Sequence, residues 1–132
     1  MVAQPSATIL LVEDDPFALD ALAQLLLAAG YEVASACNGW EALRMVRQSA
    51  PPSLIILDLL LPGLDGWSFC ETLRSDSRTQ NIPVIVCSGA PLKVQLSSSS
   101  AVTAQAFHPK PIDPDNLLAT IRELCNGDGL GH

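Results

Sequence analysis

The chain has 132 residues, of which 48% are hydrophobic, and its formal net charge at pH 7 is −7. This length and hydrophobic content indicate one folded domain with a real core, and they argue against disorder. The acidic charge disfavours direct binding to nucleic acid or to an anionic membrane, and neither a membrane-spanning run of roughly 18 apolar residues nor a signal peptide is present.

The first 36 residues predict a strand, a helix and a second strand. The first strand is expected over 8–12, where the residues are apolar and rich in β-formers. The helix is expected to begin at Pro16, because a proline loses nothing in a first helical turn, where its missing N–H would have no partner. It should end at Gly30, a residue typical of helix ends, before the second strand over 31–36.

The middle of the chain contains a helix start and an apolar strand that ends in a carboxylate. Asn38 and Glu41 have the spacing of a capping box, which predicts the start of a second helix. The third strand follows, where four apolar residues, Leu54 to Leu57, run directly into Asp58. An unbroken apolar run suits a strand that is buried on both faces of a parallel sheet, and ligands bind at the carboxyl ends of such strands. Taken alone, Asp58 is equally well explained as a loop or helix cap.

The second half of the chain continues the alternation. The expected elements are a helix over 65–76, a strand over 82–87, a helix over 92–100, a strand over 104–108, and a helix that starts at the cap Asp113 and stops at Gly127. The run from Ser97 to Ser100 contains poor helix formers, so the fourth helix should be short or irregular. Strands that alternate with helices in this way predict an α/β fold, with a parallel sheet covered by helices on both faces.

Charged and polar residues follow four of these strands at the point where each one ends. They are Glu13 and Asp14 after the first strand, Asp58 after the third, Ser88 after the fourth and Lys110 after the fifth. Parallel strands share one carboxyl edge, so these side chains should lie close together. Clustered carboxylates favour a hard divalent cation such as Mg²⁺, and a lysine can pair with a phosphate oxygen. The set therefore predicts Mg²⁺-dependent phosphoryl transfer to a carboxylate.

These motifs resemble those of response-regulator receiver domains of two-component signal transduction, of the chemotaxis-regulator type. The resemblance covers about residues 7–126, with 1–6 as an expected flexible leader and 127–132 as an expected flexible tail. It implies a three-layer, flavodoxin-like, doubly wound sandwich with five parallel strands in the order 2-1-3-4-5 and five helices. The motifs that carry it are Val12-Glu13-Asp14, Asp58 followed by Pro62-Gly63-Leu64-Asp65-Gly66, Ser88-Gly89 and Lys110-Pro111.

The resemblance also implies a magnesium site. Asp14 would bind Mg²⁺ directly and Glu13 mainly through water. Asp58 and the backbone carbonyl of Leu60 would complete the protein ligands.

For the phosphoryl group, the resemblance implies that Asp58 is the phosphoacceptor. Ser88 would hydrogen-bond the phosphoryl group, Lys110 would pair with it, and the Lys110–Pro111 peptide bond would be cis. Ser88 and Phe107 would form the switch that remodels the surface after phosphorylation. Because Phe107 is not a tyrosine, this switch would act through packing alone.

The leading hypothesis is a cytoplasmic switch that is not an enzyme. Its partners would be a sensor histidine kinase or histidine phosphotransfer protein and an unknown downstream protein. A phosphorylation-independent pseudo-receiver, a protein-interaction module, is the alternative. An aspartyl-phosphate phosphatase is disfavoured because Leu60 cannot serve as a general acid, and an FMN carrier is disfavoured because Glu13-Asp14-Asp15 would repel a phosphate.

Several other residues have structural interpretations. Asp15 should start the first helix and Asp65 the third, and His108 should be a strand-end residue. Trp40 and Trp67 are expected to be partly buried packing residues. The four cysteines form no CxxC pair, which argues against a zinc site and favours reduced, mostly buried thiols.

Overall fold

A single parallel sheet forms the centre of the molecule. The computed structural model describes residues 7–48, 50–58, 66–89 and 104–130, apart from the side chains of 66–67, 88 and 126–130. Its strands lie in the order β2-β1-β3-β4-β5, which confirms the order implied by the resemblance. Their bounds are β1 (Thr8–Val12), β2 (Glu32–Ala36), β3 (Leu54–Asp58), β4 (Val84–Ser88) and β5 (Ala106–Pro109).

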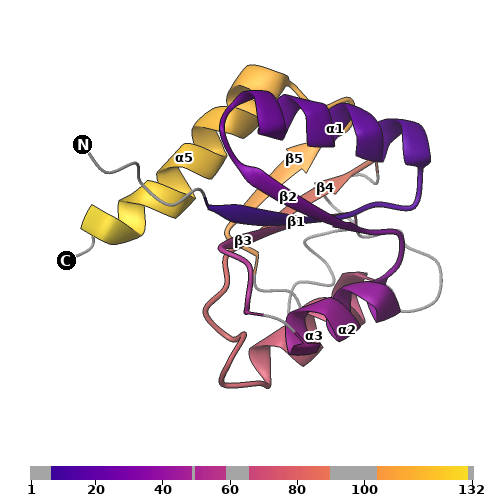
Figure 1. Cartoon of the computed structure of the whole chain (residues 1–132), viewed down its shortest axis with the longest axis vertical. Helices are drawn as coiled ribbons and strands as arrows, with labels where there is room; N and C mark the ends of the chain where they lie inside the picture. The colour runs from indigo at the N-terminus through magenta and orange to yellow at the C-terminus, as the bar shows by residue number, and fades with distance from the viewer. Residues whose placement is uncertain (1–6, 49, 59–65, 90–103, 131–132) are drawn as a thin grey trace.

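Helices cover both faces of this sheet and complete three layers. The described helices are α1 (Pro16–Ala28), α2 (Gly39–Gln48), α3 (Gly66–Arg74) and α5 (Pro114–Leu130). Figure 1 shows α1 and α5 together on one face and α2 and α3 on the other. The helix expected over 92–100 lies outside the described residues.

The sheet is apolar on both faces. Its central strands are apolar at successive positions, and successive side chains point to opposite sides of the sheet. In β3, Ile55 and Leu57 join the core beneath α2 and α3, whereas Leu54 and Ile56 join the core beneath α1 and α5. All four side chains are at most 2% exposed. This two-sided burial explains why the sequence of the strand is a continuous apolar run. Only the ends of the strand can place polar side chains near solvent.

Side-chain caps start three helices where the sequence predicts them. Asp15 accepts a hydrogen bond from the N–H of Phe17 at 3.0 Å, so it caps α1. Asn38 accepts from the N–H of Glu41 at 2.8 Å, and Glu41 in return accepts from a backbone N–H, that of Cys37. Asp113 accepts from the N–H of Asp115 at 3.1 Å at the start of α5. Each cap satisfies a backbone donor that has no partner within its helix.

Two strands, β4 and β5, begin two residues later than predicted. Ile82 donates its N–H to the carbonyl of Thr79 in a turn, so β4 begins at Val84 instead of 82. The side-chain oxygen of Gln105 accepts the N–H of Val84 at 2.7 Å, in place of a strand carbonyl, and β5 begins at Ala106 instead of 104.

Two further predictions are wrong. Helix α5 continues past its predicted end at Gly127 to Leu130, because Gly127 keeps a helical backbone and does not adopt the positive φ that Gly30 has (98°). A glycine inside a helix costs only about 1 kcal/mol relative to alanine. The side chain of Trp40 is not partly buried but 62% exposed on α2.

Candidate functional site

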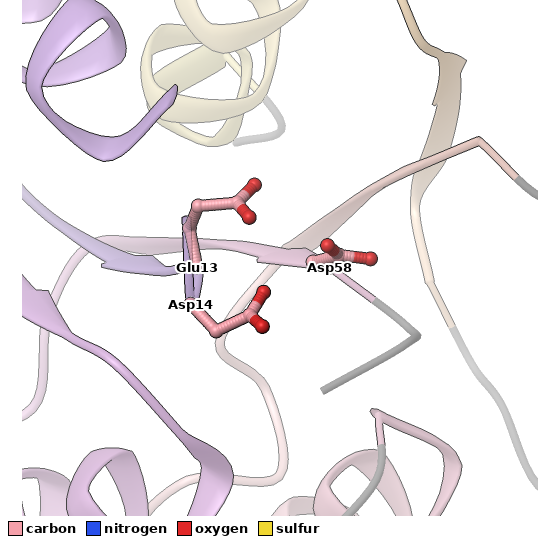
Figure 2. A group of neighbouring side chains, drawn as sticks. All are labelled: Glu13, Asp14 and Asp58. Atoms are coloured by element: carbon pink, nitrogen blue, oxygen red, sulfur yellow. The ribbon is translucent and has the colours of Figure 1, made fainter. Parts of the chain in front are cut away.

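Three carboxylates meet at the carboxyl edge of the sheet. The register of β1 and β3 pairs Val12 with Leu57, so Glu13 and Asp14 lie beside Asp58. One oxygen from each carboxylate lies within 4.8 Å of the others, and Figure 2 shows the three side chains as neighbours at the strand ends. Glu13 and Asp58 are buried, at 4% and 8% exposure, whereas Asp14 is exposed. The acidic cluster predicted from the strand ends therefore forms.

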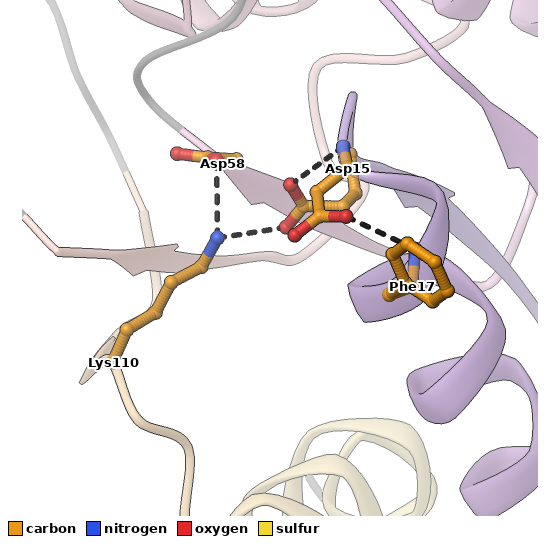
Figure 3. Close-up of polar contacts among 5 residues, drawn as sticks. Asp15, Phe17, Asp58 and Lys110 are labelled. Carbon is orange, nitrogen blue, oxygen red and sulfur yellow. Dashed lines mark hydrogen bonds and ion pairs between the residues drawn. The ribbon is translucent and has the colours of Figure 1, made fainter.

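Lys110 lies in the same cluster and bridges two of its acids. Its Nζ donates to Glu13 Oε1 at 2.8 Å and to Asp58 Oδ2 at 3.1 Å, as drawn in Figure 3. Burial alone would lower the pKa of Lys110, but hydrogen bonds and charges from Glu13 and Asp58 outweigh it and raise the pKa above its ordinary value. The lysine is therefore a fixed positive charge beside Asp58 at neutral pH.

Glu13 is held from two directions. While Oε1 accepts from Lys110, Oε2 accepts from the backbone N–H of Asp15 at 3.2 Å. Asp15 turns its own side chain to the start of α1 instead of the cluster, as the sequence predicts. Glu13 thus connects the lysine to the loop that carries Asp14.

The cluster has the donor set of a hard divalent cation. Magnesium prefers oxygen ligands from a few carboxylates and keeps several waters, and exposed Asp14 leaves room for water at this edge. Within the described residues, no other group of three His, Cys, Asp or Glu side chains has this proximity. The buried thiol of Cys87 is a poor competing ligand, because a hard cation such as Mg²⁺ prefers oxygen to sulfur. The fourth expected ligand, the carbonyl of Leu60, lies outside the described residues.

The remaining predicted site residues lie on the last two strands. Ser88 ends β4 and pairs with Pro109 of β5, which puts its backbone at the same edge, but its side chain lies outside the described part of the chain. Phe107 lies in β5, half-buried against the core beneath α2 and α3. The Lys110–Pro111 peptide bond is cis, as the resemblance implies.

A groove that no sequence motif indicates adjoins this site. It has a volume of about 480 Å³ and lies between α1 and the segment that joins β5 to α5. Leu22 and Leu25 supply part of its apolar wall, and Glu13 and Lys110 belong to both the groove and the acidic cluster. Phe17, at the start of α1, is 85% exposed. Helix α1 has more apolar residues than one buried face requires. This excess could have indicated an apolar groove beside the helix.

Comparison with known proteins gives one family. The sequence model of the response regulator receiver domain matches residues 9–122. The DNA-binding dual master transcriptional regulator RpaA of Synechocystis is 37% identical over 119 residues, covering 88% of this chain and 48% of its own. Protein PilH of Pseudomonas aeruginosa is 31% identical over 121 residues, covering 92% of this chain and 99% of its own.

Solved structures agree with this assignment. The signal receiver domain of a signal transduction histidine kinase from Syntrophus aciditrophicus is similar, with a TM-score of 0.86, 31% identity and 92% of each chain covered. The chain spans about half the length of RpaA but almost all of PilH. Among the described residues, none of the helices combines the length and apolar character needed to cross a membrane.

Proposed function

The chain belongs to the response regulator receiver domain family, and we propose that it is a signalling switch that accepts a phosphoryl group on Asp58. The observation that carries this proposal is the position of Asp58: it ends a buried strand, lies within 4.8 Å of the other two acids and is bonded to Lys110 at 3.1 Å. Phosphoryl transfer is catalysed mainly by positioning and by neutralising charge, and this site supplies groups for both.

The proposed cofactor is Mg²⁺, held by Glu13, Asp14 and Asp58 together with the carbonyl of Leu60. The ion would neutralise the charge of the incoming phosphoryl group beside three carboxylates. Asp14 is the exposed member of the cluster and so the acid that a hydrated cation meets first.

In the proposed reaction, a carboxylate oxygen of Asp58 attacks the phosphorus atom of a phosphohistidine. A new O–P bond forms and the P–N bond breaks, and the departing imidazole nitrogen keeps the electron pair and takes up a proton. Lys110 is already at hydrogen-bond distance from Asp58 and can pair with the phosphoryl oxygens on the same carboxylate. Ser88 would contribute a hydrogen bond to those oxygens, and Phe107 would carry the change to the surface as the packing partner of the switch.

Intact mass spectrometry after incubation with acetyl phosphate tests this reaction without a partner protein. The wild-type chain should gain one phosphoryl group in the presence of Mg²⁺ and none after chelation. Asp58→Asn should gain none while keeping its circular dichroism spectrum, because the amide is close in size but a poor nucleophile. A phosphoryl group on the Asn variant would overturn the assignment.

The donor protein, we propose, docks in the groove beside α1. Asp58 is only 8% exposed, so a donor histidine has to reach into the edge of the sheet while its protein rests on the surface around it. The groove is continuous with the site through Glu13 and Lys110, and its wall is apolar. An amphipathic helix that carries the phosphohistidine fits such a groove. Exposed Phe17 would pack against that helix.

Comparing two phosphodonors tests the docking surface. Phe17→Ser should slow transfer from a phosphorylated histidine phosphotransfer protein about tenfold, because truncation of an aromatic hot-spot residue costs more than about 1 kcal/mol at an interface. It should leave labelling by acetyl phosphate unchanged. Trp40→Ser is the matched control, since Trp40 is an exposed aromatic (62%) on α2, across the sheet from the groove. Equal effects of the two variants on protein-mediated transfer would contradict the docking proposal.

A further inference from the structure

A buried histidine joins β5 to α5 two residues before Lys110. His108 is 6% exposed, and its Nε2 lies 3.0 Å from the hydroxyl of Thr120 on α5. Its neighbour in sequence, Phe107, faces the opposite side of the sheet, toward the core beneath α2 and α3. The histidine is therefore part of the layer between the sheet and α5, and the acidic cluster does not use it.

The direction of this hydrogen bond follows from its partner. Thr120 donates its single hydroxyl proton to the carbonyl of Asn116 at 3.1 Å, one helical turn earlier. Both contacts are satisfied together when this oxygen accepts from the histidine, an arrangement that places a proton on Nε2. Burial lowers the pKa of His108 despite the opposing charge of Asp113, which keeps the ring neutral near pH 7. The neutral ring thus has one expected tautomer, protonated at Nε2.

The bond constrains a movement that apolar packing leaves open. Ala106, Leu117 and Ile121 belong to one apolar cluster between β5 and α5. Apolar contacts are non-directional and allow a helix to slide on a sheet at little cost, whereas a hydrogen bond requires a narrow range of distance and angle. The His108–Thr120 bond therefore adds a directional constraint on the position of α5 along β5.

Lys110 lies on the short segment between these two elements. β5 ends at Pro109 and α5 begins at Pro114, so only four residues connect them. A shift of the helix relative to the strand would therefore move this segment and Lys110 with it. The lysine must hold two distances at once, 2.8 Å to Glu13 and 3.1 Å to Asp58. We propose that His108 and Thr120 are positioning residues for Lys110 in phosphoryl transfer to Asp58, an inference that rests on the proposed function.

Thr120→Val tests this role because it keeps the shape of the side chain and removes the hydroxyl. Labelling by acetyl phosphate should slow by roughly threefold to tenfold, as expected for the loss of one such hydrogen bond. Binding of Mg²⁺ alone, followed by calorimetry, should become tighter by roughly a factor of two, because a looser Lys110 competes less for Glu13 and Asp58. Thr120→Ser, which keeps the hydroxyl, should restore both quantities.

The opposite signs of these two effects separate positioning from a general loss of structure. A variant that is merely less well folded would bind Mg²⁺ more weakly and be labelled more slowly. Thr72→Val is the matched control, because Thr72 makes the same hydrogen bond to a carbonyl one turn earlier, that of Ser68 at 2.9 Å, on α3. The proposal would be overturned if Thr120→Val were labelled by acetyl phosphate at the wild-type rate. It would also be overturned if Thr120→Val lost both labelling rate and Mg²⁺ affinity and Thr120→Ser failed to restore them.

The tautomer gives a measurement on the unmodified protein that does not depend on any variant folding. Nitrogen-15 NMR of the imidazole near pH 7 should show His108 protonated at Nε2, and a spectrum in which Nε2 has neither a proton nor a hydrogen bond would overturn the proposal. The NMR and Mg²⁺ measurements need no phosphorylation. If the wild-type chain takes up no phosphoryl group, the proposed function fails by itself, while these two measurements still decide whether the bond exists and holds the lysine.

Discussion

Replacement of Lys110 by methionine should destabilise the magnesium-free protein and tighten its binding of Mg²⁺. The substitution removes two ion pairs, at 2.8 Å to Glu13 and 3.1 Å to Asp58, whose carboxylate side chains are only 6% and 10% exposed. Removing one partner of a fully buried pair costs 3–5 kcal/mol, whereas an exposed pair contributes at most about 1 kcal/mol. The lysine side chain is itself 29% exposed, so we expect a loss of about 2 kcal/mol in the free energy of unfolding.

The pH dependence of this loss has a defined sign. The pKa of Lys110 is raised in the folded state, so its contribution is complete below the unfolded value of about 10.4 and disappears as pH rises through the folded value. The deficit of Lys110→Met should therefore be the same at pH 7 and pH 9.

Urea unfolding at low ionic strength, with and without Mg²⁺, measures the effect. Added Mg²⁺ should reduce the deficit, because the cation takes over the neutralisation of the carboxylates. Arg44→Met is the control, since Arg44 forms an exposed pair with Glu41 at 3.9 Å and should change stability by less than about 0.5 kcal/mol. A Lys110→Met variant as stable as the wild type, or one with weakened Mg²⁺ binding, would refute the reasoning.

Three other predictions concern the acids and thiols of the described chain. Asp14→Asn should weaken Mg²⁺ binding by calorimetry roughly tenfold or more, because it removes a charged ligand, and unchanged affinity would argue for a site elsewhere. Asp113→Ala should lower the free energy of unfolding by about 1 kcal/mol through loss of the α5 cap, while Asp113→Asn, which also caps, should not. At pH 8, exposed Cys37 should react first with Ellman's reagent, whereas Cys70 and Cys87 should react only on unfolding, since burial raises their pKa to about 11 and about 12. A fast thiol phase that survives replacement of both Cys37 and the partly exposed Cys125 by serine would contradict this order.

Much of this architecture could be predicted because the local signals agree with the tertiary structure. The run from Leu54 to Leu57 is apolar at every position, and the strand it forms is buried on both faces. The caps at Asp15, Asn38 and Asp113 lie where proline, glutamate and apolar spacing indicate helix starts. Since parallel strands share an edge, the strand ends alone bring Glu13, Asp14, Asp58 and Lys110 into one site.

What the sequence does not contain is the relation between side chains that meet only in three dimensions. Gln105 displaces the start of β5 through a side-chain bond to Val84, a residue 21 positions away. The pair His108 and Thr120 has no helical or strand spacing that could indicate it, and His108 reads as an ordinary strand end. The exposure of a single side chain also cannot be predicted from its local sequence. Trp40 belongs to a helix with a clear apolar stripe, yet its side chain lies outside the packed layer.

The most direct test of the central claim is the chemical location of the phosphoryl group. Borohydride reduces an aspartyl phosphate to homoserine, so reduction after reaction with acetyl phosphate and Mg²⁺, followed by peptide mass spectrometry, identifies the modified residue. The proposed function predicts that homoserine forms at position 58 and depends on Mg²⁺. Conversion at Glu13 or Asp14, or a phosphoryl group that is retained by the chain but absent from position 58, would contradict it.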